Sequence, residues 1–276
     1  MKKILPALLL TAIGSAAQAA TITYSDFSDL SDFQLNGSTA AIGNPVAPDS
    51  ALRLTNGLSQ SGSAFLTNTV SLSNQASFSA AFDFRITNPI GISDTDGQGA
   101  DGLVFVVQTV ANTAGGSGGG IGYAGLQDSV GVEFDTWNNG AWDDNSGNHV
   151  GINLDGNINS TIQSSVATRM NNGDIWSAWV DYNGVTDMLE VRLSDNGVRS
   201  TAALLSLNVD LENILGTPDA FIGFTSGTGA AGGNHDILNL EFRDDFDPID
   251  STVSLPGTLG LFGLGLIGFS VLRRRS

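Results

Sequence analysis

Two stretches of alternating side chains, separated by a polar loop, constrain the fold of this chain more than any other feature. Residues 131–137 carry apolar side chains at alternate positions from Val132, and residues 149–154 repeat the pattern from Val150. A period of two indicates extended strands that each bury one face. The intervening residues 138–148 are rich in Asn, Gly and Asp, which is typical of a turn. We therefore expect two paired strands closed by a long polar loop.

Further short apolar runs predict more strands along the chain. Residues 78–86 carry an apolar side chain at every second position. Residues 102–107 are apolar almost throughout, which favours a strand buried on both faces. The apolar segment 204–215 is of uncertain type. The other expected strands are residues 52–55, 63–66, 176–184, 188–193, 220–225 and 237–242. Many short strands joined by turns indicate an all-β sandwich.

The composition supports this fold class and limits the partners. Only 14% of the 276 residues are charged, Gly occurs 35 times and Cys is absent, so a single β-rich domain must be stabilised by its core without disulfides. Five of the 11 basic residues lie at residues 2–3 and 273–275, which leaves six arginines against 28 acidic residues between them. Nucleic-acid binding needs a basic surface, so we exclude nucleic acid as a partner. An acidic surface suits the binding of cations.

The two ends of the chain differ from its middle. Residues 1–19 combine two lysines, an apolar run and the triplet Ala17-Gln18-Ala19, which is typical of a cleaved secretory signal peptide. Residues 244–254 are acidic and are interpreted as a spacer. Residues 255–276 form an apolar segment with three terminal arginines, interpreted as a sorting or anchoring signal. The sandwich is therefore expected over residues 20–243.

Carboxylates and a histidine gather on the two alternating strands. If the strands pair, Glu133, Asp135 and His149 lie on the same side, and the loop adds Asn139 and the pair Asp143-Asp144. Clustered carboxylates raise one another's pKa unless a cation lies among them. Oxygen ligands suit Ca²⁺, whereas a histidine with carboxylates suits a transition metal such as Mn²⁺ or Zn²⁺. The alternative is a solvated acidic strand face beside an incidental histidine.

The spacing of these residues resembles the metal hairpin of the legume-type (L-type) lectins. That family has Glu-x-Asp, an aromatic residue two positions later, Asn two further, and Asp five residues before His, which here is Asp144. The resemblance implies a concanavalin-like jelly-roll sandwich that holds two ions. A transition metal such as Mn²⁺ would be held by Glu133, Asp135, Asp144 and His149. Ca²⁺ would be held by Asp135, Asn139, Asp144 and the carbonyl oxygen of Trp137. Asp143 is the alternative to Asp144, although the interval to His149 favours Asp144.

The same resemblance implies a sugar-binding pocket. Ala-Asp-Gly before an apolar strand looks like the family's sugar-binding aspartate, here Asp101, and in that family the Ala–Asp peptide bond is cis. The glycine-rich segment 114–123 matches a loop whose backbone N–H contacts sugar, best at Gly119 and next at Gly118, with a merely flexible loop as the alternative. Residues 226–235 match the loop that selects the monosaccharide, and here its tip is nearly bare of side chains. The implied carbohydrate-binding residues are Asp101, Gly119, Asn139 and Trp137, whose indole would stack on a sugar ring.

Two other polar features are interpreted as structural. Asp94 and Asp96 stand in residues 93–102, a segment that lacks the Glu needed to close a calcium loop, so we interpret it as a solvated turn. His235 follows the glycine-rich loop and is interpreted as a structural residue at the loop's end rather than as a ligand.

The C-terminal segment resembles the PEP-CTERM class of bacterial sorting signals. It consists of Leu255-Pro256-Gly257-Thr258, an apolar run and Arg273–Arg275, and it lacks the Glu of that class. The resemblance implies export to the surface or exterior of a Gram-negative bacterium, with transient membrane association through the tail. A plain membrane anchor is the alternative, although the apolar run is shorter than the ~20 residues that span a bilayer.

Three functions follow as hypotheses. The first is a lectin, not an enzyme, that depends on Ca²⁺ and a transition metal and binds a glycan or polysaccharide. The second is a glycoside hydrolase on the same sandwich, which would need a further acid after Glu133 and Asp135 where Asn138 and Asn139 stand. The third is a structural surface protein that binds no sugar. The sequence names no sugar, and it leaves the oligomeric state open, homo-oligomer included.

Overall fold

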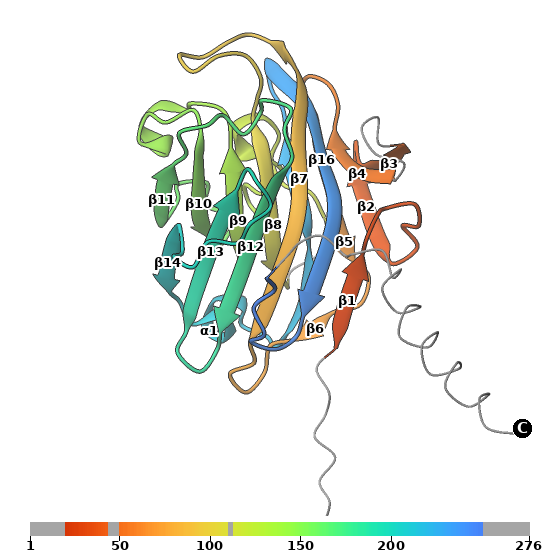
Figure 1. The fold of residues 1–276 in the computed structure, drawn as a ribbon, viewed down its shortest axis with the longest axis vertical. Helices are drawn as coiled ribbons and strands as arrows, with labels where there is room; N and C mark the ends of the chain where they lie inside the picture. The colour runs from red at the N-terminus through yellow and green to blue at the C-terminus, as the bar shows by residue number, and fades with distance from the viewer. Residues whose placement is uncertain (1–19, 44–49, 110–112, 251–276) are drawn as a thin grey trace, which may run out of the picture.

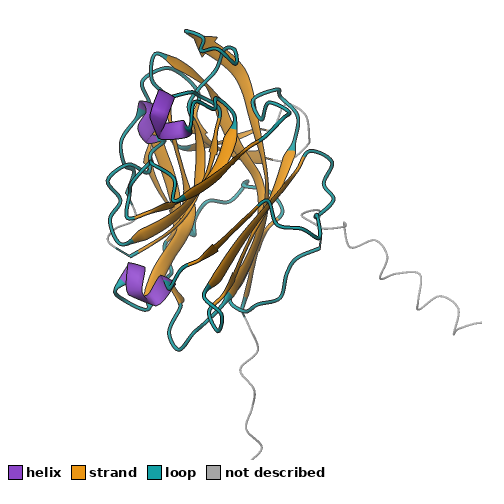
Figure 2. Ribbon diagram, turned by 90° about the vertical axis from the view of Figure 1, so that its left-hand side faces the viewer, coloured by secondary structure: helices purple, strands orange, loops and turns teal. Residues whose placement is uncertain are grey.

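The strands of the chain form two antiparallel sheets that pack face to face (Figures 1 and 2). The computed structural model describes residues 20–43, 50–109 and 113–250. The back sheet has the order β14 (Leu205–Asn208), β13 (Met188–Ser194), β12 (Trp176–Asn183), β7 (Phe78–Gly91), β16 (Ala231–Arg243), β4 (Ser50–Thr55) and β3 (Ala40–Gly43), with β1 (Thr21–Tyr24) also paired to β16. The front sheet has the order β11 (Ile162–Ser165), β10 (His149–Leu154), β9 (Ser129–Asp135), β8 (Gly102–Gln108), β15 (Asp219–Gly227), β5 (Ser61–Leu66) and β2 (Phe33–Gly37), with β6 (Val70–Ser71) also paired to β15. The all-β sandwich predicted from the sequence is confirmed.

The core fills the space between the two sheets. The alternation predicted for β7 is present, because Phe82 and Phe84 are fully buried and belong to the main core cluster. Phe82 stacks on Phe105 of β8 at 5.7 Å between ring centroids and meets Phe224 of β15 edge-on at 5.0 Å. Aromatic contacts of this kind, made across the two layers, fix how the sheets sit on each other.

Strand β8 is buried on both faces, as its continuous apolar sequence predicted. One face contributes Phe105 to the main core. The other contributes Val104 and Val106 to a second cluster with Ile121 and Tyr123. These last two residues belong to the glycine-rich segment, which contains the short 3₁₀ turn η1 (Gly118–Gly120). The segment is therefore anchored on the front sheet and is not a merely flexible loop.

Two segments differ from the sequence-based expectation. The expected loop at residues 226–235 is reduced to Thr228–Ala230, because β15 and β16 extend into it on both sides. His235 accordingly lies within β16, fully buried, with its Nδ1 2.6 Å from the hydroxyl of Thr55. The uncertain segment contains β14 and then helix α1 (Leu211–Leu215), whose N-cap Asp210 accepts a hydrogen bond from the N–H of Asn213 at 3.0 Å.

The described part of the predicted spacer, residues 244–250, folds back against the back sheet. The N–H of Asp247 donates to the hydroxyl of Ser79 in β7 at 3.1 Å. Ile249 is 3% exposed and packs with Ala81 of β7 and Trp179 of β12. This segment is thus attached to the sandwich and is not a free linker.

The predicted signal peptide at residues 1–19, the last four residues of the predicted spacer (251–254) and the predicted sorting segment at residues 255–276 lie outside the described residues. Within the described residues, no helix combines the length and apolar character needed to cross a bilayer.

Candidate functional site

The hairpin of β9 and β10 sets the positions of the first polar side chains. In its register Asp135 lies opposite His149, and Glu133 lies opposite Gly151. The apolar side chains that alternate with them belong to the core, so these polar groups project from the other face of the front sheet. The structure therefore brings Glu133, Asp135 and His149 to one side, as the alternation predicted.

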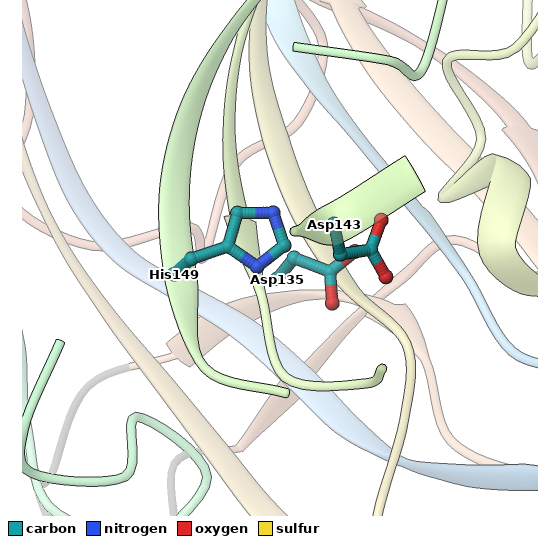
Figure 3. A group of neighbouring side chains, drawn as sticks. All are labelled: Asp135, Asp143 and His149. Atoms are coloured by element: carbon teal, nitrogen blue, oxygen red, sulfur yellow. The ribbon is translucent and has the colours of Figure 1, made fainter. Parts of the chain in front are cut away.

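The loop between these strands adds a buried carboxylate, Asp143. It ends the 3₁₀ turn η2 (Gly140–Asp143) and is 5% exposed. One ligand-type atom from each of Asp135, Asp143 and His149 lies within 4.8 Å of the others (Figure 3). The carboxylate of Asp143 also accepts a hydrogen bond from the backbone N–H of Asn139. The loop is thus folded around the same point as the strand residues.

The position of Asp144 corrects the expectation drawn from the spacing. Asp144 follows η2 in the left-handed conformation, with φ of 49°, and its side chain is exposed. The single turn of η2 directs Asp143 toward the cluster, and the next residue leaves the turn toward solvent. Asp143, the alternative in the sequence analysis, is therefore the loop carboxylate that joins Asp135 and His149.

Glu133 is 2% exposed and contacts three polar side chains. Its Oε1 lies 3.2 Å from His149 Nε2 and accepts a hydrogen bond from the hydroxyl of Ser160 at 2.5 Å. Its Oε2 accepts a hydrogen bond from Asn153 Nδ2 at 2.6 Å. Asn153 alternates with the same face as His149, so the sequence held a signal for it. Ser160 lies just before β11 and had no such signal.

Three buried carboxyl groups of this region have raised pKa values when no cation is present. Burial first, and then the charges of Glu133 and Asp143, raise the pKa of Asp135 well above its ordinary value. Burial is also the main reason that the pKa of Asp143 rises to about 6. The pKa of Asp101 rises to about 7, because of burial and then the charge of Asp143. A cation among them would lower these pKa values and favour the ionised forms.

Two buried side-chain atoms of this site lack a hydrogen-bond partner among the described residues. They are Oδ2 of Asp101 and Nδ1 of His149. A buried polar atom without a partner is costly, so each points to a ligand that the protein itself does not supply. Carboxylate, amide and imidazole groups around one point are a donor set that fits Ca²⁺ and a transition metal.

Asp101 is fixed at the start of β8. Its backbone N–H donates to the carbonyl of Gly227 at 3.1 Å, and its carbonyl accepts from the N–H of Thr136 at 2.8 Å. The Ala100–Asp101 peptide bond is cis, as the resemblance implied. The end of β15 and the end of β9 therefore both hold Asp101 in place, and its side chain is 4% exposed.

Three loops converge beside this carboxylate. A β-carbon built on Gly119 would lie 2.6 Å from Asn139 Nδ2, so the glycine-rich loop touches the hairpin loop. A β-carbon on Gly229 would lie 3.8 Å from Asp101 Oδ2 and 3.4 Å from the α-carbon of Gly118. The β15–β16 connection therefore lies between the glycine-rich loop and Asp101. Gly119 thus contacts Asn139, and its neighbour Gly118 is linked to Asp101 through Gly229.

Trp137 stands where the hairpin loop leaves β9. Its backbone N–H donates to Asp135 Oδ1 at 2.7 Å, and its side chain is half-buried. It is thus next to the acidic cluster in the chain and is held to it by a hydrogen bond.

Family models match almost the entire described chain and its C-terminal end. The legume lectin domain matches residues 19–255, and the PEP-CTERM protein-sorting motif matches residues 252–275. The second match agrees with the sorting signal inferred from the sequence.

Individual relatives and a solved structure agree with the first match. The bark lectin of Styphnolobium japonicum is 32% identical over 186 residues, which cover 63% of this chain and 64% of the relative. The L-type lectin-domain containing receptor kinase VIII.1 of Arabidopsis thaliana is 31% identical over 176 residues, covering 62% of this chain but 24% of the relative. The crystal structure of basic winged bean lectin with Tn-antigen superposes with a TM-score of 0.69 and 27% identity, covering 82% of this chain and 98% of that one.

The matched part thus spans about a quarter of the length of the receptor kinase and just under two thirds of the bark lectin. The domain match covers the sandwich, the acidic hairpin and the converging loops alike. The chain belongs to the legume lectin domain family.

Proposed function

We propose that this protein is a metal-dependent lectin that binds carbohydrate in the pocket between Asp101, Gly119 and Asn139. The observation that carries the proposal is Asp101. Its carboxylate is 4% exposed, has an oxygen without a partner among the described residues, and lies beside Gly229, which in turn lies beside the glycine-rich loop at Gly118. A fixed acceptor of this kind, surrounded by backbone without side chains, suits a ligand with many hydroxyl groups.

The metals would be held by the acidic cluster, with Asp143 in the role that the spacing had assigned to Asp144. A transition metal such as Mn²⁺ would be bound by Glu133, Asp135, Asp143 and His149. Ca²⁺ would be bound by Asp135, Asn139, Asp143 and the carbonyl oxygen of Trp137. Their positive charge would keep the buried carboxylates ionised and hold the hairpin loop in its folded form.

Each pocket residue would have a separate task in sugar binding. Asp101, kept ionised by the nearby cation, would accept hydrogen bonds from sugar hydroxyls, and such charge-assisted bonds are the stronger ones. The amide of Asn139 would donate to a hydroxyl while its oxygen faces the metal. The backbone N–H of Gly119 would donate to another, and the indole of Trp137 would cover the apolar face of the ring.

The relatives and the tail support the same conclusion. The structurally similar basic winged bean lectin was solved with the Tn-antigen. The PEP-CTERM motif at residues 252–275 supports export and sorting to the cell surface, where a glycan or polysaccharide would be met. Transient membrane association through this segment, and assembly into a homo-oligomer, remain parts of the proposal.

A glycan array probed with and without chelator tests the function. We expect binding of the full chain in Ca²⁺ and Mn²⁺, loss of binding in EDTA, and recovery when the ions are returned. Elemental analysis of protein purified without chelator should find both kinds of ion. An array without signal in the presence of both metals would overturn the proposal in favour of a structural surface protein.

The same samples separate a lectin from a glycoside hydrolase. Glu133 has hydrogen-bonding or ionic contacts to three side chains and is 2% exposed, which supports a role inside the protein rather than proton transfer to a substrate. We therefore expect no new reducing ends after incubation with any glycan that the array identifies. Release of reducing ends by the wild type, but not by Glu133→Gln, would support the hydrolase.

A further inference from the structure

The loop before Asp101 contacts the hairpin loop through two acidic side chains. Asp94 Oδ2 accepts a hydrogen bond from the backbone N–H of Asn138 at 2.9 Å. Asp96 Oδ2 accepts one from the backbone N–H of Gly147 at 2.8 Å. These contacts join segments 44 and 51 residues apart in the chain. The solvated turn expected from the sequence is therefore attached to the hairpin loop at two points.

The two points bracket the part of the loop that carries the proposed ligands. Residues 139–146 lie between Asn138 and Gly147 and include Asn139 and Asp143. The side chain of Asn138 also links the two ends of this stretch, because its Nδ2 donates to the carbonyl of Asn145 at 2.7 Å. Holding Asn138 and Gly147 thus fixes both ends of the stretch.

The side chain of Asp94 and the backbone that follows it are themselves held in place. Asp94 Oδ1 accepts hydrogen bonds from the N–H groups of Asp96 and Gly97, both at 2.9 Å. The carbonyl of Gln98 accepts a hydrogen bond from Asn171 Nδ2 at 3.2 Å. The fixed position of Asp94 means that little conformational entropy is lost when its carboxylate binds the hairpin loop.

Gly147 shows how closely the two loops approach. A β-carbon built on it would lie 2.5 Å from Asp96 Oδ2 and 2.6 Å from Asp94 Oδ2. Contacts under 3.0 Å cannot be accommodated unless something moves. Both carboxylates therefore converge on Gly147, and a larger residue there would have to displace them.

We propose that Asp94 and Asp96 are positioning residues that pre-organise the hairpin loop for metal binding and couple it to the sugar-binding Asp101. This inference rests on the proposed function, because it concerns the same metal and sugar site. Without metal, folding of the hairpin loop places the carboxylate of Asp143 beside that of the buried Asp135, which is electrostatically unfavourable. The carboxylates of Asp94 and Asp96, which we call the latch, offset part of this free-energy cost. Residues 97–100 connect the latch directly to Asp101.

The test compares the full chain with Asp94→Ala, Asp96→Ala and the double variant. Ca²⁺ affinity is measured by titration calorimetry, and glycan affinity is measured at limiting and at saturating Ca²⁺. We expect each single variant to bind Ca²⁺ about tenfold more weakly, as for loss of one charge-assisted hydrogen bond. Saturating Ca²⁺ should restore glycan affinity to within about threefold, since the ion then orders the loop by mass action. Asp26→Ala is the control, because Asp26 makes only a local turn with Ser28.

Gly147→Ala tests the same contact from the other side. It should weaken Ca²⁺ binding as much as the single latch variants do. In the double variant, where both carboxylates are gone, it should weaken Ca²⁺ binding no further. Unchanged Ca²⁺ affinity in all latch variants would overturn the inference. A loss of glycan affinity that saturating Ca²⁺ leaves in place would also overturn it, because that result indicates general structural damage. A wild type that binds neither metal nor glycan would instead overturn the proposed function, and the latch's role with it.

Discussion

Gly119 and Asn139 lie in direct contact across two loops, so close that a β-carbon on Gly119 would come 2.6 Å from the amide nitrogen of Asn139. The first residue is held on the front sheet by its loop's anchors, Ile121 and Tyr123. The second is held by the acidic cluster, because its N–H donates to Asp143. The shape of the pocket therefore depends on the metal-binding half of the site.

The first prediction concerns this contact. Gly119→Ala should displace the Asn139 side chain, because the new β-carbon would lie only 2.6 Å from its amide nitrogen. Glycan binding should therefore weaken roughly tenfold. Ca²⁺ affinity should fall much less, since the backbone of the hairpin loop stays in place. Gly116→Ala is the matched control in the same loop, where an added β-carbon would meet its nearest atom at 3.4 Å. Equal glycan affinity for Gly119→Ala and wild type would place the pocket elsewhere.

The second prediction separates the two adjacent aspartates. Asp143→Asn should lower Ca²⁺ affinity roughly 100-fold or more, because ligand charge strongly determines the affinity of oxygen sites. Asp144→Asn should leave it nearly unchanged, since Asp144 is exposed and asparagine tolerates its left-handed backbone. Calorimetric titration of both variants with Ca²⁺ provides the measurement. Loss of binding in Asp144→Asn alone would restore the assignment made from the spacing.

The difference between these aspartates shows which part of the site could not be predicted from the sequence. Alternation fixed which face of β9 carries Glu133 and Asp135, because a strand has only two faces. A loop has no such rule. The single turn of η2 decides that Asp143 faces the cluster and Asp144 faces solvent, and counting residues back from His149 does not reveal that turn.

Contacts between distant segments could not be predicted from the sequence either. The patterns of β7 and β8 predicted strands whose apolar side chains are buried, but they did not predict that the polar Ser79, Asp83 and Arg85 of β7 are buried as well. Asp94 and Asp96 were interpreted as solvated, because nothing local indicates that Asn138 and Gly147 donate to them. Ile249 was placed in a spacer for the same reason, as its partners are far back in the chain.

The third prediction is that Asp101 makes the free energy of unfolding decrease as pH rises, the reverse of the effect of an aspartate whose pKa is lowered by folding. Burial, and then Asp143, raise the pKa of its carboxyl to about 7, whereas an aspartate in an unfolded chain titrates near ~3.9. Between these values the folded state binds the proton and the unfolded state does not. The contribution of Asp101 to the free energy of unfolding therefore falls as pH rises from about 4 to about 7.

Asp101→Asn isolates this contribution. In EDTA, the free energy of unfolding of the variant relative to wild type should increase with pH, on the order of 1.4 kcal/mol per unit of pKa shift. His235 has the opposite effect, because burial lowers its pKa to about 3, but it is present in both proteins and cancels. In saturating Ca²⁺ the increase should shrink, because the cation favours the ionised carboxylate. Urea unfolding at pH 5, 6, 7 and 8 gives the comparison, and a difference that does not vary with pH would contradict it.

The fourth prediction concerns the end of the folded domain. Ile249 is 3% exposed against Ala81 and Trp179, so Ile249→Ala should lower the free energy of unfolding by about 2–4 kcal/mol, as for other large-to-small core changes. Phe246→Ala is the control in the same segment, because Phe246 is 45% exposed and its loss should cost under about 1 kcal/mol. Equal costs for the two variants would show that the segment does not pack on the back sheet.

Truncation locates the boundary independently of these side chains. A chain that ends at Asp250 keeps Ile249 and should unfold at nearly the temperature of the full chain, with glycan binding unchanged. A chain that ends at Arg243 loses Ile249 and the hydrogen bond from Asp247 to Ser79, and it exposes Trp179, which is otherwise fully buried. It should therefore melt several degrees lower and bind apolar dyes, while its Ca²⁺ affinity stays the same because the acidic cluster lies on the front sheet. A shorter chain as stable as the longer one would return residues 244–250 to the role of a free spacer.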